Sequence, residues 1–136
     1  MADLTKIRVV LENSRDVVIA RGAGREVARQ LGFGPADQTR LATAISELAR
    51  NVIQYAREGV CLVTDESNGH RISIKVVVED HGPGISDIER AMEYGFSTGG
   101  GLGAGLPGAK RLVHEFDIES QPGHTRVTIA MSRPRV

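Results

Sequence analysis

Glycine is concentrated in one stretch of this sequence. Nine of the 16 glycines lie between Gly82 and Gly108. Glycine destabilises regular helices and strands unless its backbone freedom is used. The stretch therefore predicts one functional region of exposed backbone, flanked by the regular elements that build the core.

Length and composition narrow the fold and the partners. The 136 residues are enough for one core, so residues 1–136 are expected to form a single domain. A formal net charge of zero argues against nucleic acid or an anionic membrane surface as the main partner. No apolar run reaches the roughly 20 residues of a membrane span, and no signal peptide is visible. We expect a cytoplasmic protein, with its one cysteine, Cys61, buried as a small apolar residue.

Hydrophobic periodicity predicts alternating groups of strands and helices. The expected strands are 7–11, 60–64, 71–80, 116–120 and 125–131, and the expected helices are 16–31, 35–55, 85–94 and 106–113. Leu41, Ile45, Leu48, Val52 and Tyr55 form one apolar stripe on the second helix. This order predicts an α/β two-layer sandwich, with helices on one face of a mixed, mostly antiparallel sheet.

Asp80 stands in line with core residues. Alternation along the strand 71–80 places it on the same face as four aliphatic side chains, of which Val78 is the nearest. A carboxylate there is costly unless a group donates hydrogen bonds to it, and the exocyclic amine of adenine is such a donor. Thr125 is likewise in phase with Val127 and Ile129. The alternative is that Asp80 opens a turn and accepts hydrogen bonds from the glycine amides that follow it.

Glu47 and Asn51 lie one helical turn apart at the edge of the apolar stripe. Mg²⁺ prefers oxygen ligands, and Asn51 can supply an amide oxygen while phosphates supply others. Glu47 can accept the proton of an attacking hydroxyl or orient the attacking group. The alternative is a pair of surface residues, with Glu47 bound to Arg50 or Arg57.

The loop 99–105 presents backbone amides directly before the helix expected at 106–113. Such amides and a helix N-terminus form an anion site, and the segment 86–100 could close over a nucleotide. The glycine spacing also matches a dinucleotide-binding fingerprint, but the loop does not follow a strand. It does not match a phosphate-binding P-loop, because Ala109 follows Gly108. A flexible glycine linker is the remaining alternative.

Taken together, the three segments SELARN (46–51), DHGPG (80–84) and GGGLGAG (99–105) resemble the N box and the two glycine boxes of the GHKL ATPase superfamily, whose nucleotide site is the Bergerat fold. The resemblance implies ATP and Mg²⁺ as cofactors. It also implies a catalytic acid, a magnesium ligand, an adenine contact, two glycines that shape the adenine pocket, three glycines at the phosphates, and a threonine beside the adenine. By this resemblance the acid is Glu47, the magnesium ligand is Asn51 and the adenine contact is Asp80. Gly82 and Gly84 shape the adenine pocket, and the glycines at the phosphates are Gly101, Gly103 and Gly105. The threonine beside the adenine is Thr125.

Within this superfamily, AISELARN at 44–51 and GFSTGGGLGAGLPG at 95–108 resemble the serine/threonine kinases that act as switches in bacterial stressosomes. The resemblance implies STAS-domain scaffold or antagonist proteins as substrates, and activation of a PP2C-type phosphatase once the kinase is released. One departure is His124, where a glycine commonly precedes the threonine. Two alternatives stay open, namely an anti-sigma factor kinase that sequesters a sigma factor, and a nucleotide-free adaptor whose glycine loop is only a hinge.

Overall fold

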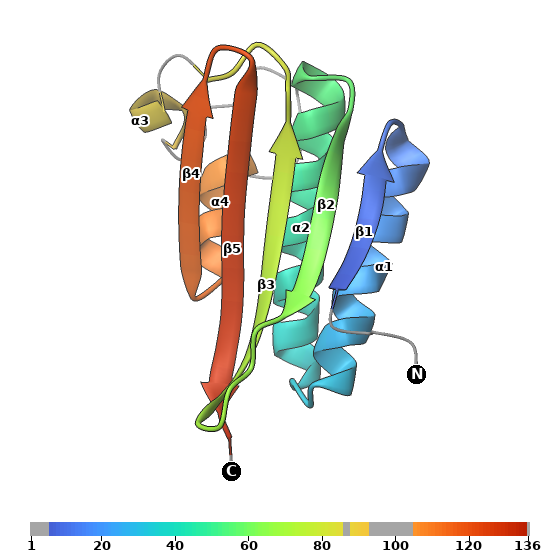
Figure 1. The fold of residues 1–136 in the computed structure, drawn as a ribbon, viewed down its shortest axis with the longest axis vertical. Coiled ribbons are helices and arrows are strands. Elements are labelled where there is room, and N and C mark those ends of the chain that lie inside the picture. The colour runs from blue at the N-terminus through green and yellow to red at the C-terminus, as the bar shows by residue number, and fades with distance from the viewer. Residues whose placement is uncertain (1–5, 86–87, 93–104, 136) are drawn as a thin grey trace.

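The computed structural model describes residues 6–85, 88–92 and 105–135, which form two layers. In Figure 1 the helices lie behind one face of a five-stranded sheet with strand order β1-β2-β3-β5-β4. In chain order the elements are β1 (Lys6–Leu11), α1 (Ser14–Gln30), α2 (Pro35–Tyr55), β2 (Gly59–Asp65), β3 (Arg71–Asp80), α3 (Ile88–Ala91), α4 (Gly105–Leu112), β4 (Glu115–Gln121) and β5 (His124–Pro134). All pairings of the described strands are antiparallel. The predicted two-layer α/β sandwich is confirmed.

Helix α1 begins earlier than the apolar pattern predicts because Asn13 caps it. The Asn13 side chain accepts hydrogen bonds from the Arg15 and Asp16 amides, at 2.9 Å and 3.3 Å. In return, the Asp16 carboxylate accepts one from the Asn13 amide at 3.2 Å. This reciprocal arrangement is a capping box. Helix α2 begins with Pro35 at its first position, where a missing N–H costs nothing.

The core lies between α2 and the inner face of the sheet. Leu41, Ile45, Leu48 and Val52 are buried as predicted. Tyr55, predicted on the same stripe, is instead 51% exposed, because it is the last residue of α2 and the helix ends there. The central strand β3 alternates strictly, with every second residue from Ile72 to Asp80 buried.

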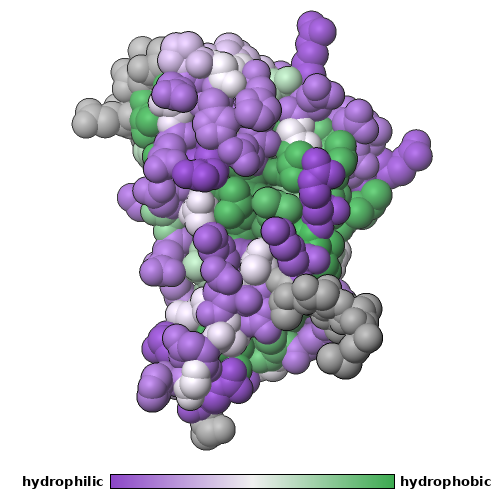
Figure 2. All heavy atoms as spheres, in the orientation of Figure 1, coloured by the Kyte–Doolittle hydropathy of each residue, from purple (hydrophilic) through white to green (hydrophobic). Residues whose placement is uncertain are grey.

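The opposite face of the sheet is not covered by any described helix. Figure 2 shows hydrophobic side chains gathered over the middle of this face and bordered by polar ones. The outward-facing apolar residues of β1, β2 and β3 are Val10, Val60, Leu62 and Val77.

Within the described ranges, no helix is long and apolar enough to cross a membrane.

Helices α1 and α2 approach each other closely at one glycine. A Cβ atom at Gly24 would overlap the Cδ1 atom of Ile45, which is fully buried. The two backbones therefore come together where α1 has no side chain. Helix α2 also contacts α4, so α2 is the middle helix of the layer (Figure 1).

The buried thiol of Cys61 gives the first testable prediction. Burial in β2 raises the pKa of this thiol from its ordinary value of 9.0 to about 12. Since the thiolate is the reactive form, we expect no reaction with Ellman's reagent at pH 8 until denaturant is added. The free energy of unfolding should also fall as the pH rises above 9, because only the unfolded chain then releases the proton. Labelling of the folded protein at the rate of a free thiol would contradict this.

Candidate active site

Asp80 and Thr125 lie opposite each other at the adjoining ends of β3 and β5. Both face the core, and their exposed fractions are only 9% and 7%. Their predicted inward orientation is therefore confirmed. The inner layer of the sheet thus ends in a carboxylate and a hydroxyl.

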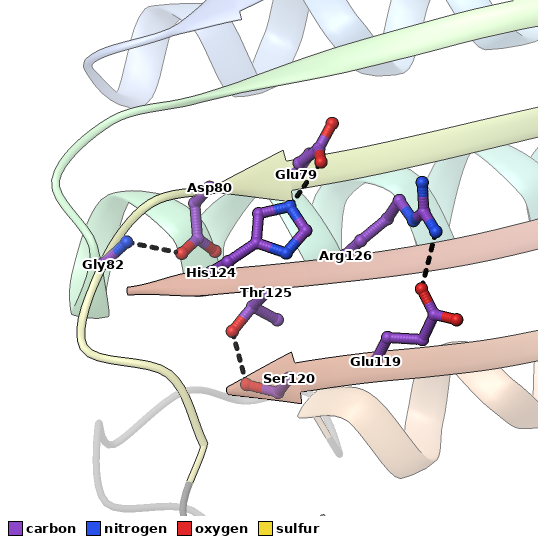
Figure 3. Close-up of polar contacts among 8 residues, drawn as sticks. All are labelled: Glu79, Asp80, Gly82, Glu119, Ser120, His124, Thr125 and Arg126. Atoms are coloured by element: carbon purple, nitrogen blue, oxygen red, sulfur yellow. Dashed lines mark hydrogen bonds and ion pairs between the residues drawn. The ribbon is translucent and has the colours of Figure 1, made fainter. Parts of the chain in front are cut away.

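The two oxygens of Asp80 have different surroundings. One oxygen, Oδ1, accepts a hydrogen bond from the Gly82 amide at 2.9 Å (Figure 3). The turn predicted as the alternative is therefore present, and it coexists with the burial. Among the described residues no group donates to the second oxygen, Oδ2. Because a buried carboxylate needs hydrogen-bond donors, Oδ2 can still take a donor from a ligand.

Gly82 and Gly84 fill places where a side chain has no room. A Cβ at Gly82 would lie 2.5 Å from the Cβ of Ala56, the residue after α2, and 3.2 Å from Asp80 Oδ1. Gly84 has φ +84°, and a Cβ there would overlap the Gln121 carbonyl oxygen and lie 2.9 Å from its carbon. The loop after β3 is thus pressed between the end of α2 and the β4–β5 turn.

Ser120 joins this loop to Thr125. The Ile85 amide donates to Ser120 Oγ at 2.8 Å, and Ser120 Oγ lies 2.6 Å from Thr125 Oγ1 (Figure 3). Sequence reasoning missed Ser120. The signal was available, because a short connection between the expected strands 116–120 and 125–131 sets a register in which Ser120 faces Thr125.

His124 lies on the outer face of the sheet, behind Thr125. Its Nε2 contacts a carboxylate oxygen of Glu79, as Figure 3 shows. The His81 ring packs at a centroid distance of 5.3 Å from the His124 ring. This group connects the end of β3 to the start of β5 on the side away from Asp80. The histidine that departs from the family pattern therefore leaves Thr125 facing the core.

Glu47 and Asn51 lie on α2. The Glu47 side chain is only 13% exposed, and Arg50 Nη2 donates to its Oε1 at 2.9 Å. The predicted alternative, an ion pair with Arg50, is therefore present. Asn51 is half-buried one turn further on. In the same turn as Glu47, the buried Ser46 donates its hydroxyl to the Ala42 carbonyl at 3.0 Å.

The described residues contain no cluster of three histidine, cysteine or carboxylate side chains that could hold a metal by themselves. The Asn51 amide and the Glu47 carboxylate one turn before it offer hard oxygen atoms, the kind that Mg²⁺ prefers when phosphates complete its coordination. The donor set therefore fits a magnesium ion that arrives with a nucleotide.

Helix α4 begins at Gly105, which has φ +61°, and lies beside α2. Leu106, Pro107 and Ala109 anchor its first turns in the core. Its N-terminal amides are unsatisfied within the helix and carry partial positive charge. Gly101 and Gly103, predicted to contact phosphates, lie outside the described residues.

Comparison with known proteins gives consistent results. Residues 36–135 match the family described as histidine kinase-, DNA gyrase B- and HSP90-like ATPase. The chain is 50% identical to serine/threonine-protein kinase RsbT of Bacillus subtilis, over 90% of this chain and 91% of that one. It is 31% identical to anti-sigma F factor of a Thermoanaerobacter species, over 83% and 82% of the two chains.

Solved structures with the same fold have lower identity. The RsbU and RsbW domains of a Mycobacterium tuberculosis protein superpose with a TM-score of 0.66 at 20% identity, covering 95% of this chain and 33% of that one. A mycobacterial sensor histidine kinase, MprB, gives a TM-score of 0.57 at 21% identity, covering 95% and 99%. At such identities these matches show the fold alone.

The role of Gly84 can be separated from simple backbone strain. We expect Gly123→Ala, at φ +90° with open space around the new Cβ, to lower the free energy of unfolding by about 1–2 kcal/mol. Gly84→Ala should cost about 1–3 kcal/mol more, because its Cβ also overlaps the Gln121 backbone. Urea unfolding of both variants measures the difference. Equal losses would show that the loop does not press against the β4–β5 turn.

Proposed function

The chain belongs to the family of histidine kinase-, DNA gyrase B- and HSP90-like ATPases and is a serine/threonine protein kinase, and we propose that it phosphorylates STAS-domain proteins of the bacterial stressosome. The observation that supports this substrate most directly is the identity with RsbT along nearly the whole chain. We also propose that the released kinase activates a PP2C-type phosphatase. The cytoplasm, where ATP is available, is the proposed location.

Asp80 is the proposed adenine contact. The exocyclic amine of the base would donate to Asp80 Oδ2, which has no donor among the described residues, while Oδ1 keeps its bond to the Gly82 amide. Gly82 and Gly84 would keep side chains out of the pocket, and Thr125 would lie beside the base. Because the Asp80 side chain is buried, a hydrogen bond to it contributes more than the same bond in water.

Asn51 is the proposed ligand of Mg²⁺, through its amide oxygen. When bound, the ion offsets the negative charge of the phosphates. The N-terminal amides of α4 at Gly105, with Gly101 and Gly103 before them, would bind phosphate oxygens. This chain's own contribution is to hold the adenine and the phosphates at opposite ends of one site.

Glu47 is the proposed base. The partner's serine or threonine oxygen attacks the γ-phosphorus, the bond to the β-phosphate oxygen breaks, and ADP leaves. Glu47 Oε2 accepts the hydroxyl proton, while Oε1 stays bound to Arg50. The ion pair with Arg50 also fixes the orientation of the Glu47 side chain, which is nearly buried.

An anti-sigma factor kinase is the second candidate function, and the 31% identity with anti-sigma F factor favours it. The two candidates differ in whether the protein binds a sigma factor stably. Size-exclusion chromatography with a bacterial stress sigma factor separates them, because the proposed switch kinase should elute apart from it.

Replacing one oxygen of Asp80 tests the adenine contact. We expect Asp80→Asn to weaken ATP binding about 10- to 100-fold by calorimetric titration, the loss of one hydrogen bond to a charged group. The amide oxygen can still accept from Gly82, so the melting temperature should change little. Asp65→Asn is the matched control, because Asp65 also ends a strand and accepts the amide two residues on, at 2.9 Å. Equal ATP affinity in both variants would exclude Asp80 from the site.

Removing the Asn51 amide tests the magnesium ligand. Asn51→Ala should lower transfer of labelled phosphate from ATP to a STAS-domain protein by at least about a hundredfold, as the loss of one electrostatic contact does in other enzymes. Gln54→Ala removes an exposed amide from the same helix and should leave the transfer unchanged. If wild type transfers phosphate and Asn51→Ala matches it, the assignment of Asn51 is wrong. If wild type itself transfers none, the proposed substrate is wrong.

A further inference from the structure

Helix α1 has an outward strip that no other described element covers. Its buried residues, which include Val17, Gly24 and Val27, face α2 and the sheet. At about 100° per residue, the side chains within about 60° of Gly22 lie on the opposite side. This strip, the α1 outer face, consists of Arg15, Val18, Ile19, Gly22, Arg25 and Arg29, with Glu26 paired to Arg29.

Nothing in the described chain requires a glycine at position 22. A Cβ there would meet nothing within 4 Å, and its φ is an ordinary negative value. Gly24, two residues on, is explained by Ile45 of α2. A glycine inside a helix is destabilising relative to alanine. The fold thus accepts a loss of stability at the centre of the α1 outer face, where the result is a bare stretch of backbone.

Two large apolar side chains border this bare stretch. Val18 and Ile19 are 53% and 50% exposed, so about half of each apolar side chain lies in solvent. They precede Gly22 by one turn, so they form a ridge beside a depression. That shape accepts a second helix at short distance, because small residues let two backbones approach.

The charges of the α1 outer face are positive. Arg29 pairs with Glu26 at 2.8 Å, but Arg15 and Arg25 form no ion pair with any described residue. Among the described residues, the Arg25 side chain makes only a long contact of 3.5 Å, to the Thr39 hydroxyl. Two uncompensated guanidinium groups therefore flank the apolar centre, and guanidinium groups bind carboxylates in paired hydrogen bonds.

We propose that the α1 outer face is a docking surface for a helix of a partner protein that carries carboxylates on both sides of small apolar residues. The apolar ridge of that helix packs at Gly22 against Val18 and Ile19, and its carboxylates pair with Arg15 and Arg25. In the helix layer α2 lies between α1 and α4 (Figure 1). A partner on the α1 outer face therefore lies on the side of the helix layer away from α4.

The probe for this proposal is a stapled helical peptide with alanine and leucine at alternating spacings of three and four and glutamate at the flanking positions. A second peptide carries lysine in place of glutamate. We expect the glutamate peptide to bind wild type at least tenfold more tightly than the lysine peptide by fluorescence anisotropy. Added salt should weaken that binding, because exposed charges are screened.

Two substitutions then place the binding on α1. Gly22→Gln should raise the melting temperature, because glutamine favours a helix more than glycine, and should lower the affinity for the glutamate peptide at least tenfold. A misfolded variant cannot give both results. Arg25→Glu should also lower the affinity for the glutamate peptide at least tenfold, and it should allow the lysine peptide to bind.

The matched controls lie elsewhere on the surface. Gly69→Gln fills equally open space in a loop, and Lys75→Glu reverses an exposed charge on the sheet. Both should bind the glutamate peptide as wild type does. The proposal is overturned if the two peptides bind alike, if Gly22→Gln binds as wild type does, or if the controls lose as much. It is also overturned if anionic phospholipid vesicles or a second copy of this chain bind the α1 outer face and the glutamate peptide does not.

Discussion

The antiparallel pairing of β3 with β5 is the constraint on which the site depends. Ten successive residue pairs hold the two strands together, from Arg71 opposite Pro134 to Asp80 opposite Thr125. Since side chains alternate between the faces, a slip of one residue would turn Asp80 and Thr125 outward and Glu79 and Arg126 inward. The buried aliphatic residues of both strands oppose such a slip, because it would expose all of them together. Hydrophobic burial therefore fixes the position of two polar side chains.

Those polar groups lie at the end of a layer built mainly from aliphatic side chains. In the part of the chain that the structure describes, Asp80 accepts one hydrogen bond, and Thr125 reaches the loop through Ser120. A core built for stability alone would place aliphatic side chains there, as it does at Val78 and Val127. A departure of this kind from local consistency is expected at a functional site. The glycines around it reinforce the same conclusion, since they bring backbone close to Asp80 and exclude side chains.

The sequence predicts the parts of this site that depend on short-range periodicity. The burial of Asp80 follows from alternation along one strand, and the positions of Glu47 and Asn51 follow from the turn of one helix. The contact between Glu79 and His124 does not follow, because it depends on the register of two strands whose residues are 45 positions apart. The start of α1 was missed although Asn13 and Asp16 have the spacing of a capping box. The exposure of Tyr55 depends on where α2 ends, which periodicity does not determine.

The strand order has a consequence for how the family can vary. β3 pairs with β5 rather than with β4, the next strand in the chain, so a long segment that contains α3, α4 and β4 is closed into a loop between these two neighbouring strands. The entropy lost on closing a loop grows only logarithmically, and doubling the length costs roughly 0.6 kcal/mol. Insertions and deletions in that loop are therefore thermodynamically inexpensive, while the pairing that closes it is slow to form because it is non-local. Evolution can lengthen or shorten this connection with little change in equilibrium stability, and the main effect of such a change is on the rate of folding.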